Sequence, residues 1–367
     1  MKQKLLLLLL LGALVACEGQ GPDGGGDENL SGSITLLADR TLIRANGSDS
    51  ASLTVLLTDD SGMIHDVTAN AEIYCGDSTE PMATTSFTTP SAGKFSFYAL
   101  YGMEISNDLE VKAVAGISDL PADGNKASTD FAHRLLLIQH TGTACPNCPK
   151  LMNTLKRVSE DEAYAGRYYH IASHSYNTDD NAYSSAAANL SGALNVKSYP
   201  WLNFNFVKAN GYLGEEADII NCIELFHEER AAVGITASSN IIDGVVYANV
   251  GVKVAEAGTY RVGVWVLEDN IQSTQSSATA SWQNNHNNCL RGMAGESKNE
   301  RIYGQNIGRV ESGATANVIL ATELDEDWYG PNCKLVVFVT TDDGQGGMEL
   351  VNSTLCPVDG SVAYAYN

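Results

Sequence analysis

Residues 141–150 read TGTACPNCPK, and this stretch decides how the middle of the chain folds. A short apolar run, RLLLIQH at 134–140, comes directly before it, as a buried parallel strand would. The segment CPKLMNTLKRVSED at 148–161 begins within the last residues of the quoted stretch and repeats apolar side chains at helical spacing. We therefore expect a strand, a turn that carries Cys145 and Cys148, and a helix that begins at the second cysteine.

Two cysteines at the start of a helix have a chemical rationale. The first helical turn offers unpaired amides and partial positive charge, which stabilise a thiolate and lower its pKa. Cys145 is expected to be the exposed cysteine that attacks, and Cys148 the one that resolves the mixed disulfide. The same pair also fits a structural disulfide that never exchanges, and the sequence leaves both interpretations open.

A metal site is a third interpretation, because two cysteines and a histidine can hold copper or zinc. Four histidines lie nearby in the sequence: His133, His140, His170 and His174. However, one Cys-x-x-Cys supplies only two ligands, and no second pair has metal-ligand spacing. We therefore expect no metal and no other cofactor.

Strands and helices alternate after the cysteines. The pattern predicts two more strands and two more helices: strands at 168–174 and 201–206, and helices at 182–195 and 215–232. Tyr199-Pro200 stands directly before the second of these strands. The combination resembles the thioredoxin fold, in which a cis-proline at this place packs against the redox pair and helps bind the substrate backbone. The resemblance implies an α/β thioredoxin-like domain over 131–234, with Tyr199 and a cis Pro200 in its site.

Two residues depart from that fold's usual pattern. Gln139 stands six residues before Cys145, where active thioredoxins often hold a buried acid that moves the proton of the second thiol. Glutamine cannot do this, and the neighbouring His140 would face the other side of the strand. Ala144 replaces the tryptophan usual before the first cysteine. Slow reductive turnover is the expected consequence.

Both ends of the chain are predicted to be β. Residues 30–118 alternate apolar and polar side chains between glycine and Asp/Asn turns, as in a small sandwich. Within them, ADRTLIRANGSDSASLTVLLTDDSG at 38–62 resembles bacterial immunoglobulin-like domains of the invasin kind, which are usually spacers or adhesive modules. A polar linker at 119–130 follows. Residues 235–367 are expected to form a second all-β sandwich, with an insertion at 270–312 that is either functional or poorly ordered.

Two segments carry a family resemblance. LLLIQHTGTACPNCP at 135–149 and WQNNHNNCLRG at 282–292 resemble segments of the Omp28-related outer-membrane lipoproteins of Bacteroidota, and the resemblance spans 131–357. It implies a cell-envelope lipoprotein with a thioredoxin-like core. It does not imply a defined reaction. The second segment contains polar residues that either shape a binding surface or tie down a solvated loop: His286, Asn287 and Arg291.

The first residues predict export. MKQKLLLLLLLGALVAC has a basic start and an apolar run too short to span a bilayer, so residues 1–16 are interpreted as a signal peptide. Its end resembles a lipobox, which implies cleavage before Cys17 and lipidation of that residue. Residues 17–29 look like a flexible tether. We expect an outer-membrane lipoprotein, on either membrane face, with no transmembrane helix.

The remaining cysteines and two acidic turns are interpreted as structural. Cys333 and Cys356 are expected to lie on paired strands and to bridge, with Cys289 as the rival partner, whereas Cys75 and Cys222 are expected to be buried single thiols. Two segments fit hairpin turns better than calcium sites: TDDSG at 58–62 and TDDGQGG at 341–347.

Charge limits the partners. The chain carries 22 Lys and Arg against 44 Asp and Glu, a formal charge of −22, which argues against nucleic acid and anionic headgroups. Two functional hypotheses follow. The first is thiol–disulfide exchange on exported proteins, as an oxidoreductase with Cys145 as the attacking residue. The alternative is a surface-binding or adhesin-type module in which the disulfide is inert.

Overall fold

The computed structural model describes residues 31–207, 215–325 and 327–367. The signal peptide, the tether and Cys17 lie outside the described residues. The described residues form two compact units, which divide between Ile117 and Ser118 and are treated separately below. Among the described residues, no helix has the length and apolar character needed to cross a membrane.

The first unit is all β, as its alternating pattern predicts. One sheet has the order β1-β3-β4 with β6 on β3, and the other has the order β2-β9-β7-β5 with β8 on β7. The two sheets share one core, in which Leu36, Val55 and Phe97 are fully buried. The strands are β1 (Gly32–Ala38), β2 (Leu42–Arg44), β3 (Ser50–Asp59), β4 (Ile64–Asp66), β5 (Glu72–Cys75), β6 (Ser86–Thr88), β7 (Gly93–Tyr101), β8 (Glu104–Ile105) and β9 (Leu109–Val114).

The second unit is built around an eight-stranded sheet with the order β12-β10-β11-β18-β15-β21-β22, and β19 pairs with β15. Its strands are β10 (Leu135–Thr141), β11 (Tyr168–His174), β12 (Trp201–Phe204), β15 (Gly258–Glu268), β18 (Cys289–Met293), β19 (Gln305–Val310), β21 (Cys333–Asp342) and β22 (Met348–Pro357). The pair β10–β11 is parallel and β10–β12 is antiparallel, so β10 is the inner strand of the three that surround the cysteines.

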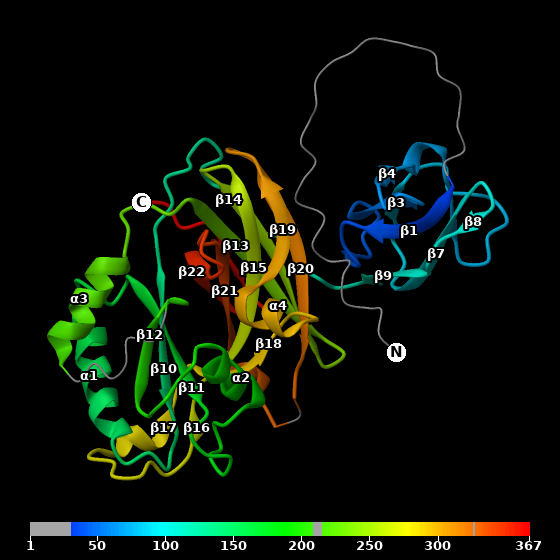
Figure 1. Ribbon diagram of the computed structural model, residues 1–367. Coiled ribbons are helices and arrows are strands. Elements are labelled where there is room, and N and C mark those ends of the chain that lie inside the picture. The colour runs from blue at the N-terminus through cyan, green and yellow to red at the C-terminus, as the bar shows by residue number, and fades with distance from the viewer. Residues whose placement is uncertain (1–30, 208–214, 326) are drawn as a thin grey trace. The chain divides into compact units, whose positions relative to one another are not determined.

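Helices cover both faces of the β10–β12 portion (Figure 1). On one face, α1 (Cys148–Glu160) and α3 (Glu216–Phe226) pack on Leu135 and Leu137. On the other face, α2 (Ser185–Ala193) packs on Leu136 and Ile138. Both predicted downstream helices are shorter than expected. The third helix ends at Phe226, and the next residue, His227, has extended backbone geometry. Further along, Ala231 forms an antiparallel bridge with Phe131.

The remainder of the long sheet packs against a second sheet with the order β20-β14-β13-β23. A core of buried valines fills the interface, and Val250, Val264 and Val337 belong to it. This pair of sheets is the sandwich that the C-terminal sequence predicts. Its added strands are β13 (Val233–Ile242), β14 (Val245–Val254), β20 (Thr315–Glu323) and β23 (Ser361–Val362).

One sheet crosses the expected boundary between residues 131–234 and 235–367. The long sheet takes strands from both segments, because β11 pairs in parallel with β18 at Ala172 and Cys289. The reason is physical: without β18, the outer side of β11 would present unpaired backbone groups at a sheet edge. The two predicted domains are therefore one compact unit.

The structure also decides between the two interpretations of the region 270–312 and places the predicted linker. The region 270–312 is not a poorly ordered insertion, since it supplies β18, β19, the short strands β16 (Ile271–Gln272) and β17 (Asn285–His286), the 3-10 turn η2 (Ser281–Asn284) and α4 (Lys298–Tyr303). The predicted linker, 119–130, lies on the second unit, where Asp123 forms an ion pair with Lys253 at 2.9 Å. A buried ammonium group without a partner would be costly, so the ion pair with Asp123 holds the segment in place.

Candidate functional site

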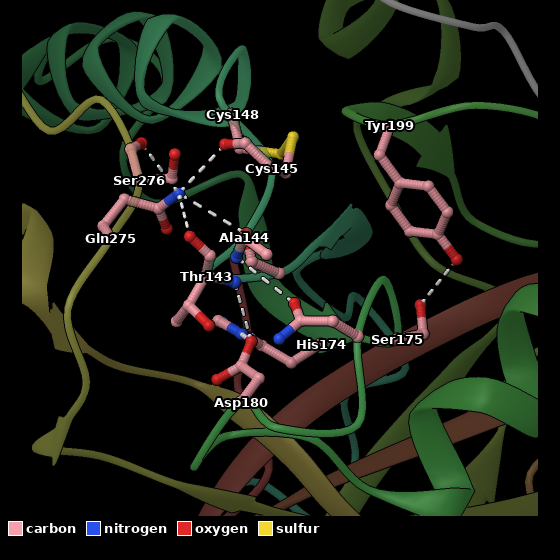
Figure 2. Close-up of a disulfide and its surroundings, with 12 residues drawn as sticks. Thr143, Ala144, Cys145, Cys148, His174, Ser175, Asp180, Tyr199, Gln275 and Ser276 are labelled. Atoms are coloured by element: carbon pink, nitrogen blue, oxygen red, sulfur yellow. Dashed lines mark hydrogen bonds and ion pairs between the residues drawn. A yellow bond between two sulfur atoms is a disulfide. The ribbon is translucent and has the colours of Figure 1, made fainter.

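The Cys145 and Cys148 side chains are joined in a disulfide where β10 ends and α1 begins (Figure 2). Cys148 is the first residue of α1, as predicted, and Pro149 occupies the first turn, where a missing amide costs nothing. The exposure of Cys145 differs from expectation. Cys145 is 1% exposed and Cys148 is 0% exposed, so neither sulfur-bearing residue lies open to solvent.

The turn before the disulfide is fixed from the β11 side. Asp180 accepts a hydrogen bond from the amide of Thr143 at 2.8 Å, and Asn177 accepts one from the amide of Ala144 at 3.2 Å. A Cβ added to Gly142 would lie 2.5 Å from the Cβ of Tyr176, so only glycine fits there. Side chains thus hold the backbone that leads into Cys145.

The same turn is held from the opposite side by the region 270–312. The buried amide group of Gln275 donates hydrogen bonds to the carbonyl of Thr143 at 3.2 Å and to that of Cys145 at 3.1 Å (Figure 2). The amide of Ser276 donates to the Thr143 carbonyl at 2.7 Å. Further along, Gln283 donates to the carbonyl of Pro149 at 3.0 Å. We call these glutamine contacts the clamp.

Sequence reasoning did not identify the clamp. Gln275 and Gln283 are single polar residues in a polar stretch, and no spacing marks them as partners of residues some 130 positions earlier. The one available signal was the length of the region 270–312, which pointed either to function or to poor order.

The peptide bond between Tyr199 and Pro200 is cis, as the resemblance to the thioredoxin fold implies. The antiparallel ladder of β10 and β12 extends to His140 and Trp201, so Pro200 lies beside the point where β10 leads into the cysteine turn. The hydroxyl of Tyr199 lies 3.0 Å from that of Ser175, which follows β11 (Figure 2). The structure thus brings Tyr199 and Pro200 to the side of the sheet where the disulfide lies.

Gln139 and His140 face opposite sides of β10, as predicted. Gln139 is buried beneath α1, and its carbonyl oxygen accepts a hydrogen bond from Nε2 of His170 at 3.0 Å. His140 faces α2, with its Nδ1 2.7 Å from the hydroxyl of Ser191. The position of the usual buried acid therefore holds an uncharged amide.

A buried acid does lie near the turn, but on the β11 side. Nδ1 of His174 lies 2.7 Å from a carboxylate oxygen of Asp180, and the side chains of Asp180 and His174 are 1% and 2% exposed. Burial acts to raise the pKa of Asp180, but hydrogen bonds from His174, Ala182 and Thr143, with the charge of His174, outweigh it and lower the pKa to about 2. Asp180 stays ionised at neutral pH, and its contacts hold the backbone of the turn.

The other cysteines that the structure describes are single thiols: Cys75, Cys222, Cys289, Cys333 and Cys356. The predicted bridge between Cys333 and Cys356 is absent among these residues. The two lie on paired strands, but Cys356 is opposite Leu335, so the cysteines are diagonal neighbours and do not face each other. Burial raises the pKa of Cys333 to about 12 and that of Cys356 to about 11, so both are poor nucleophiles.

The histidines expected near the cysteines do not converge. His140 faces α2, His170 bonds Gln139, and His174 pairs with Asp180. Within the described ranges, no three His, Cys, Asp or Glu residues are grouped so as to hold a metal ion. In both acidic turns, a carboxylate accepts hydrogen bonds from backbone amides of the same turn, as is usual in hairpin turns. Asp59 accepts from the amides of Ser61 and Met63, and Asp343 accepts from those of Gln345 and Gly347.

The polar cluster expected in the region 270–312 is divided. Arg291 is buried against Glu268, with Nε 3.1 Å from a carboxylate oxygen, and takes no part with the other two residues. His286 and Asn287 instead line a cavity beside α1.

Comparisons with known proteins agree with parts of this description. Residues 202–356 match the family model described as outer membrane protein Omp28. The structure of HBP35 of Porphyromonas gingivalis is similar, with a TM-score of 0.53 and 15% identity over 63% of this chain and 77% of that one. At this identity the likeness concerns the fold alone. The adhesin InvE of Yersinia pseudotuberculosis also matches, at 12% identity over 93% of this chain and 61% of that one, but its TM-score of 0.17 supports no argument.

No curated protein matches the chain. The family match covers most of the second unit but not the cysteine turn. It confirms the resemblance seen in the sequence and supports a place in the cell envelope. Residues 202–356 are therefore similar to the Omp28 outer membrane protein family.

Proposed function

We propose that this protein performs thiol–disulfide exchange on exported proteins, with Cys145–Cys148 as the centre of a thioredoxin-like arrangement within the second unit. One observation carries the proposal: the disulfide lies at the start of α1, on the side of the sheet where the cis Tyr199-Pro200 bond precedes β12. A helix start stabilises the thiolate that exchange requires. The match to an outer-membrane family is consistent with exported proteins as substrates.

The exchange oxidises a substrate dithiol. A substrate thiolate attacks Sγ of Cys145, the bond between the two cysteines breaks, and Cys148 leaves as a thiolate that takes up a proton. The substrate's second thiolate then attacks the substrate sulfur of the mixed disulfide, and Cys145 leaves. The substrate gains one disulfide and loses two electrons and two protons, and the protein holds two thiols. A second disulfide-bearing protein returns it to the oxidised form by the reverse exchange.

The burial of Cys145 sets a condition on this reaction. An attacking thiolate must approach along the axis of the disulfide, and a residue that is 1% exposed does not allow this without local movement. The clamp holds the Cys145 carbonyl and opposes such movement. The uncharged Gln139 also leaves the proton of the second thiol without the usual acceptor. Exchange is therefore expected to be slow in the absence of a substrate that opens the turn.

The alternative, a surface-binding module with an inert disulfide, is favoured by these same two observations. Its all-β first unit and its C-terminal sandwich would then carry the binding. In this case the disulfide would only fix the start of α1.

A trapping experiment separates the two functions. Cys148→Ser leaves Cys145 as a single thiol, which attacks the disulfides of oxidised exported proteins in the reverse of this exchange. No second cysteine then releases the mixed disulfides, so they should accumulate until a reductant is added. Cys145→Ser is the matched control and should capture none. Equal capture by the two variants, or capture by neither, contradicts exchange and leaves the binding module.

We also propose that Cys17 carries a lipid that attaches the chain to the membrane. The support is the sequence LVAC at 14–17 and the match to an outer-membrane family. Metabolic labelling with a palmitate analogue should mark the wild type and not Cys17→Ala. Equal labelling of both proteins would contradict the proposal.

A further inference from the structure

Large apolar side chains are exposed in two hairpins of the first unit. Among residues 31–117 there are four of them: Met63 at 61% exposure, Ile64 at 43%, Met103 at 101% and Ile105 at 64%. None of the four belongs to the core that the two sheets share. Apolar side chains that are exposed together on a folded unit mark a contact with a protein or with a membrane.

Met63 and Ile64 lie in the hairpin between β3 and β4. Asp59, the last residue of β3, pairs with Gly32, the first residue of β1. This hairpin is therefore at the end of the unit where β1 begins. The Asp59 carboxylate accepts hydrogen bonds from the amides of Ser61 and Met63, each at 2.9 Å, so the turn holds Met63 in place.

Met103 and Ile105 lie in the hairpin between β7 and β8. Tyr101 pairs with Glu104, so only Gly102 and Met103 form the loop. Gly102 has a φ of 61°, which glycine adopts readily in a tight two-residue turn. Met103 thus stands at the tip of an ordered hairpin.

Both hairpins lie at the same end of the unit. The strand that leads into β7 is β6, in which Thr88 pairs with Ser50 at the start of β3. Asn107, just after β8, exchanges hydrogen bonds with the backbone of Leu36 in the second half of β1, at 3.0 and 3.2 Å. β3 and β7 therefore begin at one end and both run to the end where β1 begins. We call that end, formed by residues 59–64 and 101–105, the hairpin end.

The chain enters the unit at the hairpin end, because β1 begins at Gly32. Cys17, the residue proposed to carry a lipid, lies 14 positions before Ser31, and 14 residues span at most about 50 Å. The opposite end of the unit is a strand length further away, about 33 Å for the ten residues of β3. A lipid on Cys17 therefore keeps the hairpin end nearest to the bilayer.

The charges at the hairpin end restrict the kind of lipid surface. Residues 59–64 and 101–105 contain three acidic side chains, Asp59, Asp60 and Glu104, and no Lys or Arg. Anionic headgroups would repel them, whereas zwitterionic headgroups would not. Apolar side chains of membrane-surface proteins sink into the boundary between headgroups and acyl chains, and the exposed side chains of the two hairpins suit that depth.

We propose that the hairpin end docks on a zwitterionic lipid surface, with its four exposed apolar side chains at the boundary between headgroups and acyl chains. The lipid on Cys17 attaches the chain, and the hairpin end orients the first unit on the membrane. This docking rests on the proposed membrane attachment and is independent of thiol–disulfide exchange. The competing occupant of the hairpin end is a second copy of the chain.

Quenching by brominated phosphatidylcholine tests the docking. The mature chain from Cys17 onward, with a histidine tag at its N-terminus, is attached to phosphatidylcholine vesicles through a small share of nickel-chelating lipid, so attachment does not require acylation. Met103→Trp places a fluorophore at the hairpin end, and Ala92→Trp places one at an exposed position of the opposite end, just before β7. Brominated lipid should quench the added fluorescence of Met103→Trp and leave that of Ala92→Trp unchanged. Equal quenching of the two variants, or quenching of neither, overturns the proposal.

A further variant separates docking from simple proximity. Met63→Ser, Ile64→Thr and Ile105→Thr are added to Met103→Trp, which removes the other apolar side chains and leaves the attachment as it was. Quenching should then fall to that of Ala92→Trp, and quenching that does not fall overturns the proposal. Sedimentation tests the competing occupant: a dimer that these substitutions abolish, without quenching, assigns the hairpin end to a second copy and also overturns it. Quenching in a protein whose Cys17 is not labelled by palmitate supports docking and contradicts only the lipid.

Discussion

The disulfide turn and the cavity beside α1 share that helix as a wall, yet their polar groups are treated in different ways. In the turn, the backbone groups of Thr143, Ala144 and Cys145 are bonded by side chains from two directions. Among the residues that line the cavity, Nε2 of Gln139, Oγ1 of Thr141 and Oδ1 of Asn285 are buried and have no protein partner among the described residues. The first arrangement resists movement, and the second leaves buried polar groups unsatisfied.

This difference indicates that the Cys-x-x-Cys motif alone does not determine which residues of this unit carry its function. The residues that close the turn and the residues that shape the cavity both come from the region 270–312. That region matches the outer-membrane family, whereas the cysteines lie outside the match. Function is therefore expected to depend on contacts between the two segments and not on either of them alone.

The largest expected effect follows from breaking the turn at Asp180. Asp180→Ala leaves His174 and the Thr143 amide buried without their partner, and loss of one member of a buried pair costs about 3 to 5 kcal/mol. Urea unfolding of the second unit should show this loss. Asp179→Ala, an exposed neighbour, should unfold as the wild type does. A change of less than about 1 kcal/mol in Asp180→Ala, the value of an exposed pair, would contradict the buried role.

The clamp is expected to have the next largest effect. Gln275→Leu removes the donors to the Thr143 and Cys145 carbonyls and should destabilise the turn by about 2 kcal/mol, or two hydrogen bonds. Opening of the turn should then be more frequent, and dithiothreitol should reduce the disulfide about tenfold faster or more. Gln272→Leu, an exposed glutamine on the nearby β16, is the matched control. Equal reduction rates in the two variants would mean that the clamp does not guard the disulfide.

Acidification should weaken the second unit before its carboxylates titrate. Burial is the main cause that lowers the pKa of His133, His140, His170 and His286 to about 4. The unfolded chain binds protons on these histidines below about pH 6.5, and the folded protein does not. Stability should therefore fall as the pH decreases from 6.5 towards 4, by up to about 1.4 kcal/mol per pH unit for each histidine.

Urea unfolding at pH 7.5, 6.5, 5.5 and 5 measures this slope. His140→Gln should flatten it, because one titrating group is removed from the folded core. If His140→Gln leaves the slope of unfolding free energy against pH unchanged, the pH dependence arises from other groups.

The smallest effect on stability is expected in the cavity. Thr141→Val removes a hydroxyl that has no protein partner among the described residues, so the free energy of unfolding should stay within about 0.5 kcal/mol of the wild type. A loss of stability as large as that expected for Gln275→Leu would show that the cavity is held by internal bonds, as the turn is.

Much of the disulfide region follows from local sequence. The apolar run of β10, the helical spacing of α1 and the opposite orientations of Gln139 and His140 are all as expected, because each depends on neighbours within a few residues. The cis bond at Pro200 is also as expected, but that expectation came from the resemblance to the thioredoxin fold. The all-β character of both flanking segments follows in the same way from alternation.

The remaining features depend on pairing between distant segments, which no local pattern records. The parallel contact of Ala172 with Cys289 joins two predicted domains into one unit. Gln275 reaches the cysteine turn from the same distant region, so the clamp could not be foreseen from its own neighbours. The register of β21 and β22 sets Cys333 and Cys356 diagonally, and sequence patterns rarely fix register to one residue.

The redox equilibrium of the Cys145–Cys148 pair in glutathione buffers tests the central claim most directly, with the fraction reduced measured by mass shift after thiol alkylation. Exchange on exported proteins predicts a potential within the range of cellular glutathione poises, about −180 to −320 mV, reached while the protein stays folded. A pair that remains oxidised throughout that range, or that reacts only after unfolding, would contradict exchange. The disulfide would then be structural, and function would belong to the cavity and the β sheets.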